Sequence, residues 1–150
     1  MGILNSILGA FGSKNNKTSL IAKQITIDQL DKELDLLSAG KTEFDYIGIT
    51  SNGDDCIYFI KINDKYNIEF EAMAETQIPF MEKLKEYANI KGFQFRMTTY
   101  GNKPHYHSVK EAPVLQIETN SDIAETVKIG EEIETRIFGN HSETKYDVVP

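Results

Sequence analysis

Three places in the chain hold side chains that could do chemistry. His105 and His107 stand one residue apart, and two neutral imidazoles at this spacing can both reach a metal ion. Asp54 and Asp55 are paired carboxylates, which can bind a cation or exchange protons. Cys56 follows directly and could act as a nucleophile if a basic group lay beside its thiol.

We favour a structural role at each of these places. A metal site on the histidine loop would need further ligands, and Glu111 and His141 could join only through the fold. The two aspartates follow Asn52-Gly53, and Asn, Gly and Asp together are typical of a turn. Cys56 begins an apolar run, where a free cysteine usually packs as a small hydrophobic residue. We therefore predict no catalytic, metal-binding or cofactor-binding residue and no cofactor.

Length and charge restrict the class of protein. The 150 residues are 40% hydrophobic, enough for one domain with its own core. The net charge of −7 argues against a nucleic-acid partner, because phosphate binding needs a basic face. The single cysteine indicates a reducing compartment, and neither a secretory signal nor a run long enough to span a membrane is visible. We expect a bacterial, cytoplasmic protein that is not an enzyme.

The first 27 residues differ from the rest, because they contain Lys14, Lys17 and Lys23 but no acidic residue. Five apolar residues there recur at helical spacing: Ile3, Leu4, Ile7, Leu8 and Phe11. This stripe could dock on its own domain, pair with another subunit or lie on a membrane surface. We favour docking within the protein or its oligomer, and treat membrane contact through residues 1–14 as the weaker alternative. Residues 1–19 are thus an amphipathic segment and linker, and residues 20–150 a single domain.

The middle of the chain reads as consecutive antiparallel strands followed by a helix and another strand. Asn52-Gly53 favours a type I′ turn between the first two strands, and Asn63-Asp64-Lys65 separates the second from the third. The expected strands are 44–50, 56–62, 66–72 and 93–100, and the expected helix is 79–91. The helix should bury Phe80, Leu84, Tyr87 and Ile90.

Two further helices have clear boundaries in the sequence. Thr26 and Gln29 form a capping box at the start of the first, and Gly40 suits its end. A short strand, 114–119, precedes the last helix, which Asn120 or Ser121 should cap. That helix should turn inward Ile123, Val127, Ile133 and Ile137, and Gly130 should interrupt it. The tail 141–150 should add an edge strand or dock on the core.

These elements predict an α+β fold, with an antiparallel sheet of about five strands in the order α-β-β-β-α-β-β-α. We expect the helices to pack mainly on one face. The strand Cys56–Ile62 is apolar on both faces, so its second face should be covered or form an interface. Eight residues therefore form our candidate interaction surface: Ile3, Leu4, Ile7, Leu8, Phe11, Tyr58, Ile60 and Ile62.

The element order over about residues 26–139, with the acidic charge and small size, resembles the type III secretion chaperone fold. That fold is shared by the YbjN-type sensory-transduction regulators. The resemblance implies a small acidic homodimer that holds extended peptide segments of other proteins in apolar grooves and performs no catalysis. The N-terminal stripe and its lysine-containing linker depart from the pattern, and no functional residue carries over by motif.

The leading hypothesis is a non-enzymatic, chaperone-like, protein-binding module, expected to be a homodimer. One alternative is an immunity-type or antitoxin-like inhibitor, a small acidic protein that neutralises a basic partner. The other is a metal-binding protein that uses His105 and His107.

Overall fold

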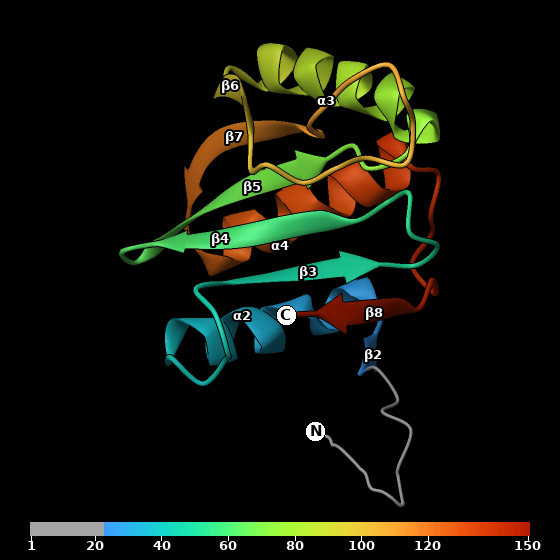
Figure 1. Ribbon diagram of the computed structural model, residues 1–150. Helices are drawn as coiled ribbons and strands as arrows, with labels where there is room; N and C mark the ends of the chain where they lie inside the picture. Colours follow the sequence, from blue (N-terminus) through green and yellow to red (C-terminus); the bar gives the residue numbers. More distant parts are fainter. Residues whose placement is uncertain (1–22) are drawn as a thin grey trace, which may run out of the picture.

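The computed structural model describes residues 23–150 (Figure 1). The strands are β2 (Gln24–Ile25), β3 (Tyr46–Thr50), β4 (Ile57–Ile62), β5 (Lys65–Glu71), β6 (Gln94–Thr99), β7 (Pro113–Ser121) and β8 (Tyr146–Val149). The helices are α2 (Leu30–Ser38), α3 (Ile78–Lys91) and α4 (Ile123–Glu132), with short helical turns η1 (Ile27–Gln29), η2 (Glu75–Gln77) and η3 (Ile133–Ile137).

The seven strands of residues 23–150 form one antiparallel sheet in the order β2-β8-β3-β4-β5-β7-β6. The α+β class and the consecutive pairing of β3, β4 and β5 are confirmed. The expected number of five strands is wrong, because β2 and β8 add two short strands beside β3. The C-terminal tail therefore enters the sheet between β2 and β3 and does not form its edge.

The helices lie on one face of the sheet and cover the hydrophobic core. Figure 1 shows α2 and α4 behind the central strands, with the opposite face of β3, β4 and β5 turned to the viewer. The core contains Leu30, Leu34, Ile49, Ile57, Phe59, Ile68, Phe70, Leu84, Leu115, Ile129 and Ile133, each 1% exposed or less. One face of the sheet is thus largely apolar and packs against the helices.

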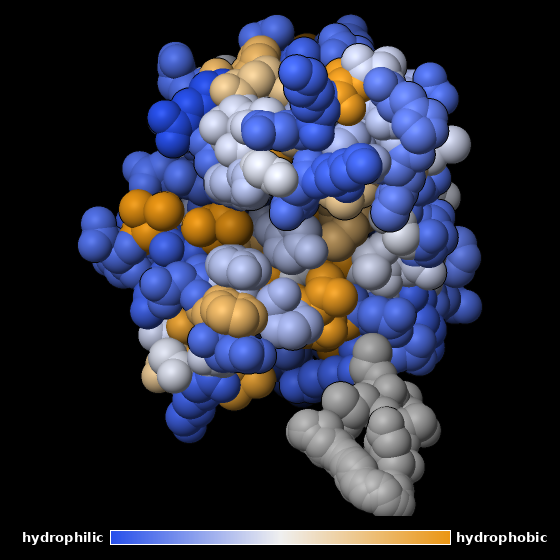
Figure 2. Space-filling view, in the orientation of Figure 1, coloured by the Kyte–Doolittle hydropathy of each residue, from blue (hydrophilic) through white to orange (hydrophobic). Residues whose placement is uncertain are grey.

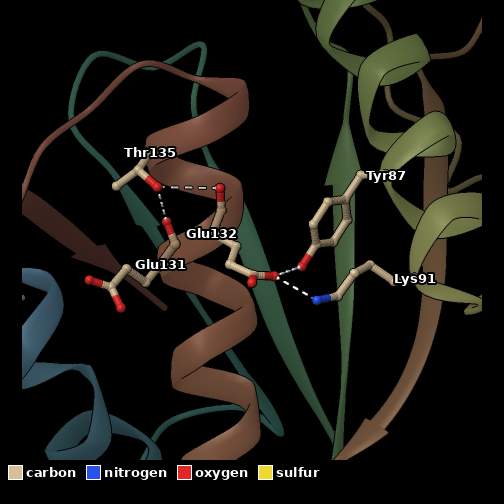
Figure 3. A network of polar contacts seen from close by, with 5 residues as sticks. All are labelled: Tyr87, Lys91, Glu131, Glu132 and Thr135. Atoms are coloured by element: carbon tan, nitrogen blue, oxygen red, sulfur yellow. Dashed lines mark hydrogen bonds and ion pairs between the residues drawn. The ribbon is translucent and has the colours of Figure 1, made fainter.

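Helix α3 is attached to α4 by a small polar network (Figure 3). The Tyr87 hydroxyl donates to Glu132 Oε1 at 2.5 Å, and Lys91 Nζ lies 3.1 Å from the same oxygen. The rings of Phe80 of α3 and Phe138, which follows η3, also pack together, 4.8 Å apart between centroids. Ile90, by contrast, is 77% exposed, so its expected place in the core is wrong. Met81 and Ala88 are buried in the same helix.

The loop between β3 and β4 is organised by a side chain and is not a type I′ turn. Gly53 has a φ of 92°, but Asn52 does not share the positive φ that this turn needs at both positions. The carboxylate of Asp55 accepts hydrogen bonds from Thr50 Oγ1 at 2.7 Å and from the Ser51 amide at 2.8 Å. The Ser51 hydroxyl donates to it as well. The acidic residue therefore determines the conformation of this loop.

The first helix begins as expected, since the Thr26 amide donates to Gln29 Oε1 at 2.9 Å. The last helix is different. Its cap is Asp122, which accepts from the Glu125 amide at 2.9 Å, because β7 extends to Ser121. Gly130 does not interrupt α4, because its missing side chain lets the helix approach the ring of Phe59. A Cβ there would lie 3.2 Å from Phe59 Cζ.

We predict that the two faces of β4 differ sharply in their contribution to stability. Phe59→Ala should lower the free energy of unfolding by about 3–5 kcal/mol, because it leaves a cavity between the sheet and α4. Ile62→Ala is the matched control on the opposite face, where the side chain is 49% exposed, and should cost less than about 1 kcal/mol. Urea denaturation of both variants measures the difference. Equal losses would contradict the one-sided core.

Candidate functional site

The face of the sheet opposite the helices carries a hollow of about 490 Å³. Its aromatic lining is Tyr46, Tyr58 and Tyr100, and its apolar lining is Ile60, Val114 and Pro150. Two carboxylates, Glu69 and Glu71, and the amide of Asn102 complete it. We call this hollow the open-face groove. Figure 2 shows hydrophobic and intermediate surfaces across the middle of this face, bordered by hydrophilic ones.

Strand alternation places these residues. Successive side chains of a strand point to opposite faces, so burying Ile57 and Phe59 turns Tyr58 and Ile60 outward. Gly48 on β3 lies opposite Tyr58, and a Cβ there would lie only 2.8 Å from the tyrosine ring. The absence of a side chain at Gly48 therefore lets the ring of Tyr58 lie close against β3.

The aromatic side of the groove is a connected set of rings. Tyr46 and Tyr58 have centroids 5.9 Å apart and planes at 76°, an edge-to-face arrangement. Phe44 stacks on Tyr46 at 5.2 Å with nearly parallel planes. Burial raises the pKa of Tyr58 well above its usual range, so its hydroxyl stays protonated at neutral pH. The groove thus presents neutral aromatic surfaces.

The acidic side of the groove is held by neutral donors. Glu69 accepts from the Tyr100 hydroxyl at 2.5 Å and from Gln116 Nε2 at 3.0 Å. Glu71 accepts from Asn102 Nδ2 at 2.7 Å. Within residues 23–150, neither of these carboxylates forms an ion pair. Their carboxylates are thus held in the groove by neutral donors, and the nearby Arg96 hydrogen-bonds to Gln116.

Part of our candidate interaction surface gathers here. Tyr58 and Ile60 line the groove, and Ile62 follows on the same strand, half exposed. The other five residues, Ile3, Leu4, Ile7, Leu8 and Phe11, lie outside the described residues. Sequence reasoning missed Tyr46, Tyr100 and the two glutamates. The alternation of Glu69 and Glu71 along β5 was visible, but it indicated only a solvent-facing side.

The histidine loop lies between β6 and β7 and crosses in front of β5 in Figure 1. Its backbone is fixed by the His105 amide, which donates to the Met73 carbonyl at 2.8 Å, and Tyr106 donates to the Ala72 carbonyl at 3.1 Å. The side chains of His105 and His107 are exposed. In the described part of the chain, no three His, Cys, Asp or Glu side chains converge to hold a metal.

Cys56 is partly buried and lies immediately before β4. Burial raises the pKa of its thiol to about 12, which keeps it protonated at neutral pH. A thiol in that state is a poor nucleophile. The packing role that we favoured for this residue is consistent with its position.

A second polar cluster, which the sequence did not reveal, lies inside the fold. Asn140 Nδ2 donates to Asp55 Oδ2 at 2.8 Å and to Glu134 Oε1 at 3.0 Å. Both carboxyl groups are fully buried. A protonated acid beside an ionised one is a pattern of acid–base sites, but full burial denies a substrate access to this pair. The cluster therefore attaches the β3–β4 loop to η3.

The fold shifts the pKa values of the two acids of this cluster in opposite directions. Burial, with the nearby charge of Asp55, raises the pKa of Glu134 from an ordinary value of 4.5 to about 9. Burial also acts to raise the pKa of Asp55, but hydrogen bonds from Ser51, Thr50 and Asn140 outweigh it and leave that pKa lowered. Glu134 is thus neutral, and Asp55 ionised, in the folded protein at neutral pH.

No match identifies the chain. Comparison with known proteins finds no family model, no curated protein and no solved structure that matches it. The resemblance to the type III secretion chaperone fold therefore stays a prediction based on element order. Among residues 23–150, no helix combines the length and apolar character needed to cross a membrane.

We predict that stability falls with rising pH because of Glu134. The fold favours its protonated form, so this stabilisation is complete below pH 4.5 and is lost as pH rises from there to about 9. The loss from this group should approach 1.4 kcal/mol per pH unit within that window. Glu134→Gln keeps a neutral side chain of similar shape, and should therefore remove most of this slope.

Urea denaturation between pH 5 and pH 9 measures the effect, with Glu131→Gln on the exposed side of α4 as the control. The control should keep the wild-type slope. An identical slope in wild type and Glu134→Gln would contradict the buried neutral acid. Asp55 has its effect at acidic pH. Its contribution to stability is lost as the pH falls below the ordinary pKa of 3.8 toward the lowered pKa of the folded protein.

Proposed function

We propose that this chain is a non-enzymatic, protein-binding module that holds a segment of a partner protein on the open face of its sheet. The observation that carries the proposal is the open-face groove, because no helix of residues 23–150 covers it. A central strand with half-buried apolar and aromatic side chains on its uncovered face is typical of a binding surface.

The lining of the groove supports a protein partner. Tyrosine is enriched where proteins bind one another, because its large ring gives contact area with few rotatable bonds and its hydroxyl offers a hydrogen bond. Three tyrosines here lie beside Ile60 and Val114. Interfaces of this kind depend on a few aromatic residues at their centre, and Tyr58, on β4 between β3 and β5, is our candidate for that role.

The inhibitor of a basic partner is the second candidate. It is favoured by the net charge of −7 together with Glu69 and Glu71 in the groove. An acidic surface accelerates encounter with a basic protein at low salt. Both candidates use the same face, so one set of variants tests them.

Substitution of the open face should weaken partner binding strongly without unfolding the protein. The test variant is Tyr58→Ser with Ile60→Ser, and the control is Ile90→Ser, whose side chain is 77% exposed on α3. A partner isolated with the wild-type chain is purified and titrated by calorimetry against each variant. We expect at least about 30-fold weaker binding for the test variant, because aromatic centres of interfaces contribute about 2 kcal/mol or more. Unchanged affinity with the test variant would contradict the proposal.

The homodimer is a further part of the proposal, supported by the resemblance in element order. We predict a mass of twice 17.0 kDa in solution. Size-exclusion chromatography with light scattering measures it across a range of concentrations. A strict monomer at the highest concentration would exclude the dimer, but would not contradict the proposal that the open face binds a partner.

A further inference from the structure

The open-face groove combines two features that attract a cation. Its first feature is aromatic: Tyr46 and Tyr58 both line the hollow, and their rings meet edge to face at 76°, a pair that we call the aromatic corner. The quadrupole of an aromatic ring makes its face electrostatically negative, so a positively charged group within about 6 Å of the ring centre is stabilised. Arginine and lysine side chains are the usual protein groups that use this interaction.

The second feature is a pair of carboxylates that line the same hollow. Glu69 and Glu71 are two residues apart on β5, and therefore point to the same face of the sheet. Glu69 pairs with Tyr58 of the neighbouring strand in the register of the sheet, which places its carboxylate next to the aromatic corner.

Both carboxylates keep capacity for a further donor. A carboxylate can accept about four hydrogen bonds, and these two receive two and one from side chains. Arg96 lies close by, but its Nε donates to Gln116 Oε1 at 2.6 Å. Three other glutamates, by contrast, are ion-paired with lysines: Glu33, Glu82 and Glu132.

The lining also suits the uncharged part of a long cationic side chain. Ile60 and Val114 border the same hollow, so an aliphatic stem can pack there while its charged end reaches the glutamates. A guanidinium is planar, so it can stack on a tyrosine and donate two hydrogen bonds to one carboxylate. The volume of about 490 Å³ falls in the range of sites that hold a small ligand or a side chain with its neighbours.

We propose that the open-face groove selects a basic side chain, arginine above lysine, in the segment of the partner protein that it holds. This inference rests on the proposed function and names the chemistry that the partner must present. The charge of the groove and that of the side chain are complementary, which excludes acidic segments as well as favouring basic ones.

Selection of random peptides on the immobilised full-length chain tests the proposal. We expect the enriched peptides to share an arginine or lysine at one position. Each is then titrated by calorimetry beside a version with citrulline, which keeps the shape of arginine but has no charge. The citrulline peptide should bind about tenfold more weakly, and the arginine peptide should weaken as salt is raised.

Matched variants separate the groove from the general charge of the protein. Glu69→Gln with Glu71→Gln should remove the preference for arginine over citrulline. Glu86→Gln with Glu131→Gln removes the same charge from exposed positions on α3 and α4, and should leave the preference intact. A preference that survives the groove variant, or no preference in the wild-type chain, would overturn the inference.

The remaining outcomes are also decisive. Peptides that bind without regard to charge, and lose binding in Tyr58→Ser with Ile60→Ser, would overturn the inference and leave the proposed function standing. A selection that enriches no peptide would count against both. If N-acetylarginine amide alone binds as tightly as the peptides, the ligand is a free cation and not a protein segment. If the wild-type chain is a dimer and Glu69→Gln with Glu71→Gln makes it a monomer, a second copy of the chain occupies the groove. That result would also overturn the inference.

Discussion

The packing of Phe59 between the sheet and α4 is the contact on which the rest of the structure depends. Its ring fills the space that Gly130 leaves on the helix, and Leu30 of α2 reaches the same place. Because alternate residues of a strand face opposite sides, burying Phe59 fixes the direction of every other side chain of β4. Tyr58 and Ile60 lie on the open face as a direct consequence. The binding surface is thus determined by the core behind it.

The register of the sheet also fixes which side chains of the neighbouring strands lie on the open face. Tyr58 lies opposite Gly48 on one side and Glu69 on the other. The glycine makes room for the ring, and the glutamate places a carboxylate beside it. A shift of one residue in either pairing would bring Ile47 or Ile68 to the open face and bury polar groups in the core. The composition of the groove and the stability of the core therefore depend on one register.

Local patterns in the sequence predicted the elements, but could not show which distant segments meet. The capping box at Thr26, the strands of the central meander and α3 follow from spacing within a few residues. The place of β8 beside β3 does not, since nothing in Tyr146–Val149 specifies its neighbour. The contact of Asp55 with Asn140 and Glu134 is equally remote in the chain. Three of the nine residues that line the groove were missed for this reason, because Tyr100, Asn102 and Pro150 reach it from a loop and from the C-terminus.

Burying an ionised carboxylate costs free energy, and the acidic groups of this protein avoid that cost in two ways. Glu134 is surrounded by the core and faces Asp55, so it gives up its charge and remains as a neutral acid. Glu69 and Glu71 are only half buried and are held by the hydroxyl and amide donors of Tyr100, Gln116 and Asn102. Those donors orient the carboxylates without neutralising them. A fold that needed these two residues only for stability could have paired them with lysine, as it does for Glu132. Carboxylates that are oriented but form no ion pair within residues 23–150, beside tyrosine rings on a face that no helix of those residues covers, suit a cation that this part of the chain does not supply.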